Sequence, residues 1–185
     1  MRKTLIALAT ASLFAAPAFA AKAPVVNSNI TEAEVIAAQG AWCNALVNIS
    51  TTYREQGREA ATTLAGNVLD AAYGYQMGPV LFKPTLTVAP QTFRTTREGA
   101  LAYFVGGNDK FPNDSGFALK GWTACKAENV AIQIHGDVAT TMGNVMITNR
   151  DGEVTTVDKT WKFKKTDDGS LRIVVHHSSL PHTAG

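Results

Sequence analysis

The sequence predicts an α+β protein in which helices come first and an antiparallel sheet follows. Two observations carry this prediction. Apolar residues recur at three- and four-residue steps early in the chain, and strand-length segments separated by Gly- and Asp-containing turns fill the second half. We expect the sheet to curve around a helical hairpin and form a cone with an internal pocket. Such a cone often holds a small-molecule site, but its architecture does not decide the function.

The first twenty residues predict an export signal that is absent from the mature protein. Arg2 and Lys3 precede an apolar run over residues 5–16, and Ala18 and Ala20 frame a cleavage site. The run is too short to span a membrane. We therefore expect cleavage after Ala20, a periplasmic location, a tether over residues 21–30 and a single domain over residues 31–182.

The mature domain is expected to be close to neutral. The chain has 17 basic and 15 acidic residues, and Arg2 and Lys3 account for two of the basic ones. Nucleic acids and anionic membranes both require a basic excess, so neither is expected as a partner. After the leader, no apolar stretch of the sequence approaches membrane-spanning length.

Two cysteines, Cys43 and Cys125, allow two interpretations. Export to an oxidising compartment permits a disulfide, whereas buried free thiols are also common in protein cores. The sequence does not give the Cα separation that a disulfide needs, so the pairing stays open. A cysteine-based zinc site is not expected, because the chain has no C-x-x-C pair.

The first predicted helix covers residues 31–57. Thr31 and Glu34 have the spacing of a capping box, in which each side chain satisfies a free backbone N–H of the other residue. Its apolar face is formed by Val35, Trp42, Leu46, Ile49 and Tyr53. A second helix is expected over residues 58–72 and a short third one over residues 97–105, which Gly106-Gly107 ends.

The strands are predicted mainly from their turns. A short strand over residues 80–82 is stopped by Pro84. After a polar loop over residues 108–115, we expect strands over residues 116–122, 126–135, 138–148, 155–165 and 171–179. Turn residues lie at Gly136-Asp137, Asp151-Gly152 and Asp167-Asp168-Gly169.

The last predicted strand ends in four polar residues, His176-His177-Ser178-Ser179, which need hydrogen-bond partners if they are buried. Spacing alone allows either a strand end exposed to solvent before Pro181 or part of a site. Residues alternate between the two faces of a strand. One face is expected to carry Leu171, Ile173, Val175, His177 and Ser179, and the other Arg172, Val174, His176 and Ser178.

Two familiar chemistries are poorly supported at this strand end. Ser178 has no G-x-S-x-G elbow, and the sequence identifies no third member of a Ser-His triad. His176 and His177 point to opposite faces, so they should not share a zinc ion. His135 and His182 add no recognised ligand spacing.

A second group of candidates lies in the middle of the chain: Tyr73, Tyr75, Lys83, Thr85 and Tyr103. These are hydrogen-bonding side chains within a largely apolar stretch. The alternative for the tyrosines is core packing with the hydroxyl reaching the surface. For Lys83 the alternative is a solvated charge.

Five segments of the sequence, taken in order, match the pattern of a known family. They are Val80-Leu81-Phe82-Lys83-Pro84-Thr85-Leu86, Tyr103-Phe104-Val105-Gly106-Gly107-Asn108, Asp114-Ser115-Gly116-Phe117-Ala118-Leu119 with Trp122, Met142-Gly143-Asn144, and His176-His177-Ser178-Ser179-Leu180-Pro181. Together these segments resemble the iota-class carbonic anhydrases. The resemblance runs from about Trp42 to Pro181. The sequence departs from the family pattern at Asp158-Lys159-Thr160-Trp161, where a more acidic or aromatic strand is expected, and at Val145.

The resemblance implies a SnoaL-like, nuclear-transport-factor-like cone, also described as cystatin-like. This cone is related to the association domain of calcium/calmodulin-dependent kinase and usually forms a homodimer. The implied reaction is the reversible hydration of carbon dioxide to bicarbonate. Metal-free members bind bicarbonate through threonine, tyrosine and serine hydroxyls, which correspond here to Thr85, Tyr103 and Ser178. No cofactor is expected on this basis, although other members are described as using zinc or manganese.

His176 shares the predicted face of Ser178 and is the candidate supporting residue. Its ordinary pKa also suits proton transfer near neutrality. We expect an apolar wall of Phe104, Phe117 and Trp122 to hold carbon dioxide. Secondary candidates are Lys83, Tyr75, His177 and Ser179.

Two other functions remain open from the sequence. The cone could be a non-enzymatic domain that binds a small ligand or mediates oligomerisation. A wide apolar pocket would favour that reading, and a buried cluster of three hydroxyls would favour the enzyme. A nucleotide-processing cyclohydrolase has less support, because the sequence shows neither its metal ligands nor a phosphate-binding loop.

Overall fold

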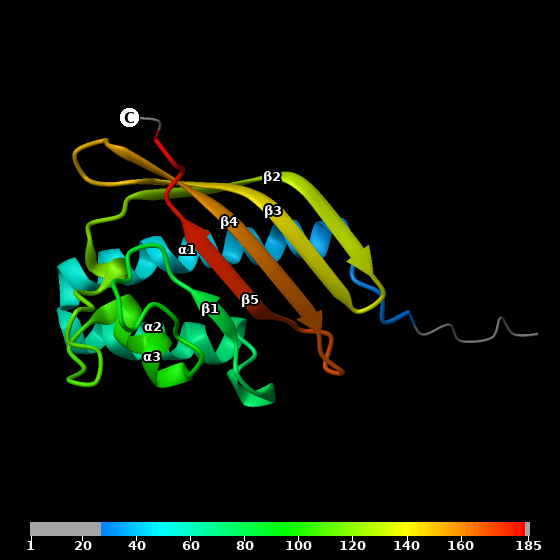
Figure 1. Ribbon diagram of the computed structural model, residues 1–185, viewed down its shortest axis with the longest axis horizontal. Coiled ribbons are helices and arrows are strands. Elements are labelled where there is room, and N and C mark those ends of the chain that lie inside the picture. The colour runs from blue at the N-terminus through cyan, green and yellow to red at the C-terminus, as the bar shows by residue number, and fades with distance from the viewer. Residues whose placement is uncertain (1–26, 184–185) are drawn as a thin grey trace, which may run out of the picture.

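The computed structural model describes residues 27–183 (Figure 1). The predicted export signal and most of the predicted tether lie outside the described residues. Among residues 27–183, no helix is both long enough and apolar enough to cross a membrane.

The chain folds into helices packed on a five-stranded sheet, which confirms the predicted α+β class. The sheet order is β1-β5-β4-β3-β2; β1 runs parallel to β5, and every other pair is antiparallel. All predicted helices and strands but one are confirmed to within two residues. The elements are α1 (Glu32–Gln56), α2 (Arg58–Ala72), η1 (Tyr75–Met77), β1 (Leu81–Lys83), α3 (Arg97–Val105), η2 (Phe117–Leu119), β2 (Ala124–His135), β3 (Val138–Thr148), β4 (Val154–Lys165) and β5 (Leu171–Ser179).

Helix α1 supplies one wall of the core. Figure 1 shows it crossing one face of the sheet, from the β2–β3 turn toward the end where α2 and α3 gather beside β1. Each large apolar side chain buried in this way contributes about 1.5–3 kcal/mol. The buried residues of this layer include Val35, Trp42, Leu46 and Ile49 from α1 and Val145, Ile147, Trp161 and Phe163 from the sheet.

The two ends of α1 follow from local sequence. The predicted capping box is confirmed, since the Glu34 N–H donates to Thr31 Oγ1 and the Thr31 N–H donates to the Glu34 carboxylate. Gly57 ends the helix with a φ of 86°, a conformation that favours glycine. Because α2 begins at the next residue, the two helices form a tight hairpin.

The strand predicted over residues 116–122 is wrong. Residues 117–119 form the short helix η2 instead. Gly116 enters it with a φ of 93°, which breaks an extended chain, and the indole N–H of Trp122 donates to the Phe117 carbonyl at 2.7 Å. This turn places Phe117 and Trp122 in the core rather than in the sheet.

Strand β5 contains a β-bulge that the sequence did not reveal. Lys162 and Phe163 are neighbours on β4, but they pair with Val175 and Ile173 on β5. Val174 is therefore the extra residue of the bulge. Such a residue reverses the alternation of side chains beyond it.

The bulge changes which residues share a face. The prediction that Ile173 lies on the face of His177 is wrong, because Ile173, His176 and Ser178 are all buried and His177 is exposed. The predicted pairing of His176 with Ser178 on one face is confirmed. These two residues point into the core, so the strand end is not simply exposed to solvent.

A disulfide resolves the cysteine question. Cys43 of α1 and Cys125 of β2 are bonded, with their Cα atoms 5.1 Å apart. The bond attaches the long helix to the edge strand of the sheet.

Gly143 has a structural role in the Met142-Gly143-Asn144 motif. A Cβ atom at this position would lie 2.0 Å from the Glu128 carbonyl oxygen on β2. The β2–β3 register shifts close to this contact, between Asn129 and Ala131. The glycine is needed because the two strand backbones approach so closely here.

Candidate active site

Two of the three predicted hydroxyls are in direct contact. Thr85 Oγ1 donates to Ser178 Oγ at 2.6 Å. The sheet explains this contact, since β1 pairs in parallel with β5 and Lys83 lies opposite His177. β1 ends at Lys83 and the chain turns at Thr85, which brings the Thr85 hydroxyl to the buried side chain of Ser178.

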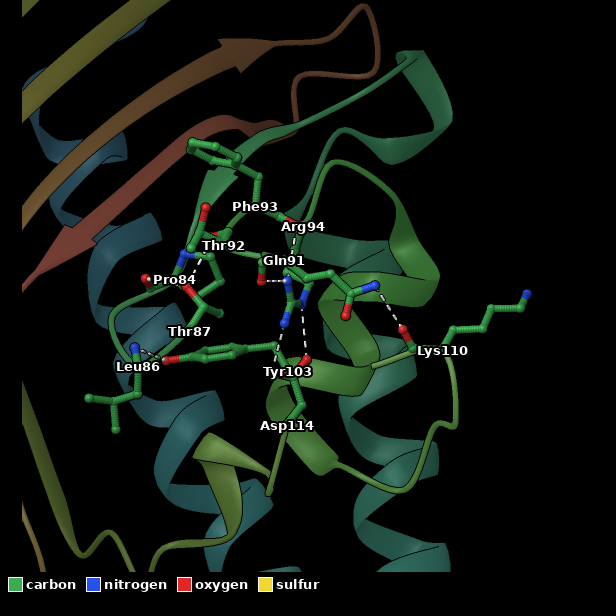
Figure 2. Close-up of polar contacts among 10 residues, drawn as sticks. All are labelled: Pro84, Leu86, Thr87, Gln91, Thr92, Phe93, Arg94, Tyr103, Lys110 and Asp114. Carbon is green, nitrogen blue, oxygen red and sulfur yellow. Dashed lines mark hydrogen bonds and ion pairs between the residues drawn. The ribbon is translucent and has the colours of Figure 1, made fainter. Parts of the chain in front are cut away.

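The third hydroxyl comes from α3. The Leu86 N–H donates to the Tyr103 hydroxyl at 3.4 Å, as Figure 2 shows, so Tyr103 meets the segment that carries Thr85. Burial raises the pKa of Tyr103, and hydrogen bonds from Leu86 and Thr85 only partly oppose the rise. Tyr103 is therefore a neutral phenol at physiological pH, able to donate a hydrogen bond. The structure brings together all three hydroxyls.

The segment that carries Thr85 is a strap, residues 84–96, between β1 and α3. Its own hydrogen bonds hold its shape: Thr87 Oγ1 donates to the Thr92 carbonyl at 3.0 Å and to the Pro84 carbonyl at 3.4 Å (Figure 2). The strap has no regular secondary structure, so these contacts and its anchors set the position of Thr85.

The main anchor of the strap is a buried ion pair. Arg94 donates to both carboxylate oxygens of Asp114, at 2.9 and 2.7 Å, and both side chains are 2% exposed (Figure 2). The Arg94 guanidinium also donates to the carbonyls of Gln91 and Phe93, and it lies 4.7 Å from the centre of the Phe111 ring. Such two-pronged pairing fixes orientation as well as position.

Sequence reasoning missed Arg94. The signal available was Asp114, which begins one of the five family segments without an evident partner. The structure supplies that partner and explains the aspartate as an anchor of the strap.

The predicted apolar wall surrounds Tyr103. Phe117 stacks on the Tyr103 ring with centroids 5.3 Å apart, and Trp122 packs behind Phe117 at 5.4 Å. Phe104 contacts Tyr103 at 5.5 Å and stacks on Phe82 at 5.8 Å. All three predicted wall residues are buried.

Two of the secondary candidates, Lys83 and Tyr75, contact the hydroxyl site or its strap, and the other two lie on the outer face of the sheet. Lys83 Nζ donates to the Ser178 carbonyl at 3.0 Å, and burial lowers the pKa of Lys83. The Tyr75 hydroxyl donates to the Arg94 carbonyl at 2.9 Å and so supports the strap. His177 and Ser179 line a groove of about 360 Å³ on the outer face of the sheet, away from the three hydroxyls.

His176 is enclosed behind the hydroxyls. Its Nδ1 lies 2.8 Å from the Tyr73 hydroxyl, and its Nε2 lies 2.7 Å from Lys159 Nζ. The Phe82 ring stacks on the imidazole with centroids 4.4 Å apart. Burial, with a smaller effect from the charge of Lys159, lowers the pKa of His176 well below its ordinary value. Both ring nitrogens are thus occupied by protein groups.

Sequence reasoning also missed Lys159 as a site residue. Lys159 is 4% exposed and follows the inward alternation of its strand, between Val157 and Trp161. A lysine in such an apolar stripe was the available signal, since lysine is rarely buried. The departure from the family pattern at 158–161 therefore includes a core residue.

The described chain offers no cage for a metal ion. Among residues 27–183, no group of three or more His, Cys, Asp or Glu side chains is placed to hold one. The donors that converge at Thr85 and Ser178 are neutral hydroxyls, which are poor ligands for zinc.

The fold and site define the class of protein as an α+β fold in which hydroxyls from the strap, α3 and β5 meet. A calcium/calmodulin-dependent protein kinase II association domain from Xanthomonas campestris shares this fold. Its TM-score is 0.51 at 22% identity, covering 84% of this chain and 91% of that one. This similarity concerns the fold alone.

A family model described as metal-independent carbonic anhydrase matches residues 33–180. The chain therefore belongs to the metal-independent carbonic anhydrases, the iota class. This family agrees with the prediction that no cofactor is needed.

Two relatives show how close the similarity is. A metal-independent carbonic anhydrase from Nostoc sp. (strain PCC 7120) is 62% identical over 161 residues, which cover 87% of this chain and 78% of the relative. The crystal structure of the iota-carbonic anhydrase from a cyanobacterium, complexed with bicarbonate, has a TM-score of 0.87 at 61% identity. The match covers 89% of this chain and 100% of that one.

Proposed function

We propose that this protein hydrates carbon dioxide reversibly to bicarbonate at the Thr85–Tyr103–Ser178 cluster, by hydroxyl groups rather than a metal-bound hydroxide. The observation that carries the proposal is the convergence of the three side chains. Thr85 and Ser178 share a hydrogen bond of 2.6 Å, and Tyr103 binds the backbone next to Thr85. The bicarbonate in the solved relative supports a site for the same anion here.

The reaction needs a positioned water and donors for the charge that develops on the carbon dioxide oxygens. A hydroxyl provides one donor and two acceptor lone pairs. The Thr85 O–H goes to Ser178, so Thr85 can accept from the water while Ser178 keeps its O–H for the product. Tyr103 stays protonated because burial raises its pKa, which leaves its O–H for the developing negative charge. The rings of Phe117 and Phe104 next to Tyr103 provide apolar surface for carbon dioxide.

Metal removal tests the hydroxyl mechanism. Proton release during carbon dioxide hydration would be followed by stopped flow on protein treated with a strong chelator and checked for residual metal. We expect the metal-stripped protein to keep the rate of untreated protein. A loss of activity that returns only when zinc or manganese is added would rule the mechanism out.

We also propose that the protein is exported, with its mature form starting at Ala21, and that it forms a homodimer. The leader pattern and the disulfide support export, because disulfides persist in oxidising compartments. The outer face of the sheet supports the dimer. Met142 is 61% exposed and lines the groove of about 360 Å³, and Val130 beside it is 81% exposed.

A further inference from the structure

A buried chain of hydrogen bonds lies behind the hydroxyl cluster. It runs from Trp42 on α1 to Tyr73 at the end of α2, then to His176 on β5 and Lys159 on β4. The distances are 2.9 Å from Trp42 Nε1 to the Tyr73 hydroxyl, 2.8 Å from that hydroxyl to His176 Nδ1, and 2.7 Å from His176 Nε2 to Lys159 Nζ. All four side chains are at most 5% exposed.

The direction of this chain can be derived from its donors. An indole N–H only donates, so the Tyr73 oxygen accepts from Trp42. Burial raises the pKa of Tyr73 well above its ordinary value, so the phenol keeps its proton and donates it to His176 Nδ1. A neutral imidazole that accepts at Nδ1 carries its own proton on Nε2. That proton points at Lys159 Nζ, which can accept it only as an unprotonated amine.

The surroundings of Lys159 favour the same state. The amine is buried, and no ion pair joins it to a carboxylate within residues 27–183. Burial lowers the pKa of Lys159 to about 7. The indoles of Trp42 and Trp161, with ring centres 4.9 and 5.3 Å from Nζ, keep the ammonium form accessible. The amine can therefore carry or release a proton near neutrality.

The groups that face Lys159 come from several elements. His176 on β5 and Tyr73 after α2 are the titratable ones, and α1 presents the uncharged Trp42. Strand β3 places Gly143 opposite Lys159 and so adds no side chain. On β1, Lys83 binds the Ser178 carbonyl and adds a second positive charge rather than a counterion.

Lys159 is next to the hydroxyl cluster in the sheet. In the β4–β5 register it lies directly opposite Ser178, whose hydroxyl accepts from Thr85. Opposite residues of an antiparallel pair have Cβ atoms roughly 4.5–5.5 Å apart. The Lys159 side chain thus starts beside Ser178 and extends along the same face to His176.

We propose that Lys159, held as a neutral amine by His176, is the proton acceptor for carbon dioxide hydration in this enzyme. As a water at the hydroxyl cluster forms its bond to the carbon of carbon dioxide, its O–H bond breaks. The Nζ lone pair leaves the His176 N–H and takes that proton. The products are bicarbonate and the Lys159 ammonium, which then loses its proton to solvent buffer. This inference rests on the hydroxyl site proposed above.

The hydrogen bonds from Trp42 to Lys159 also favour release of the proton from the Lys159 ammonium. When Nζ is an ammonium it donates to His176 Nε2, and the imidazole proton then belongs on Nδ1, facing Tyr73. The Tyr73 oxygen would accept from both Trp42 and His176, which are its hydrogen-bond partners in the described chain, and its own O–H would lose its acceptor. A buried donor without a partner is unfavourable, so the network returns to the neutral amine.

The pH dependence of the rate tests Lys159. The acceptor must be unprotonated, so kcat/KM for hydration should rise with pH through about 7 and level off above it. Lys159→Met should lower hydration about 10²- to 10⁴-fold and remove this rise. Lys159→Arg should be equally slow, because a guanidinium keeps the charge and cannot release its proton.

The controls separate this role from packing and from the hydroxyl mechanism. Lys162→Met, on the same strand with its side chain on the other face, should keep the rate and the rise. A purely structural cation would be replaced well by arginine, so an active Lys159→Arg variant would overturn the proposal. Ser178→Ala should be slow at every pH but keep the rise; full activity in that variant refutes the hydroxyl site instead.

A measurement on the unaltered protein guards against variants that fail to fold. With ¹³C-labelled lysine, one ε-carbon resonance should titrate near pH 7, and this resonance should be missing from Lys159→Arg. If all lysines of the folded enzyme titrate near the ordinary value, Lys159 is not the acceptor.

Discussion

At the scale of single residues, the site combines three neutral hydroxyls with a titratable pair behind them. Burial controls both groups. It keeps the proton on Tyr103 by raising its pKa, and it favours the neutral forms of His176 and Lys159 by lowering theirs. Tyr103 therefore remains a hydrogen-bond donor, and neutral His176 links Tyr73 to Lys159. Lys159 is the proposed base.

Removing a single hydroxyl tests this arrangement. Tyr103→Phe and Ser178→Ala should each reduce kcat/KM for hydration by about 10- to 1,000-fold, the range for loss of one positioned donor. Stopped-flow proton release measures the rate, and Tyr53→Phe on α1 is the matched control expected to retain it. Unchanged rates in both site variants would remove these residues from the site.

At the scale of elements, the three-residue strand β1 and the strap decide where Thr85 lies. The parallel pairing of β1 with β5 places the end of β1, Lys83, beside His177. The Arg94–Asp114 ion pair then holds the strap that follows. Neither feature has a regular pattern in the sequence. The irregular part of the chain is held by a charged pair because it has no ladder of backbone hydrogen bonds.

Loss of one partner of that pair should be costly. Asp114→Ala leaves the Arg94 charge buried and unpaired, so the free energy of unfolding should fall by about 3–5 kcal/mol. Hydration should also slow, since Thr85 loses its support. In the control Glu98→Ala, the pair with Lys110 is broken, and the loss should be much smaller because both side chains are exposed. Denaturant unfolding measures both, and equal losses would contradict this account.

At the scale of the whole molecule, α1 is both a wall of the core and a source of site contacts. Trp42 belongs to the buried chain behind the site, and one residue later Cys43 is bonded to β2 across a sequence separation of 82. In the chain-entropy model, a disulfide closing a loop of this length contributes about 4.5 kcal/mol. It holds the helix against the sheet whose face carries Lys159 and Ser178.

Mass spectrometry tests the proposals at this scale. Protein recovered from a bacterial periplasmic fraction should have a denatured mass that starts at Ala21 and is two hydrogens below the reduced value. Native spectra should show twice that mass, since we propose a homodimer. Reduced protein with the leader still attached would contradict export, and a monomer at micromolar concentration would contradict the dimer.

Much of the architecture could be predicted because it depends on local patterns. The bounds of α2, α3, β3 and β5 follow from periodicity, glycines and turn residues, and the capping box at Thr31 marks the start of α1. The strand predicted over 116–122 failed because Gly116 needs a positive φ, which an apolar pattern does not indicate. The family segments supplied the three hydroxyls, which periodicity alone could not have selected.

By itself, the sequence determined the α+β class and the order of the elements. Its resemblance to a family also selected Thr85, Tyr103 and Ser178 as candidate site residues. Only the tertiary structure decided that Val174 is a bulge, that Cys43 reaches Cys125, and that Lys159 ends at His176. The physical reason is the separation along the chain over which each interaction acts. Helix caps, turns and alternation act between neighbours in the chain, whereas a bulge, a disulfide and a buried amine depend on contacts between distant segments.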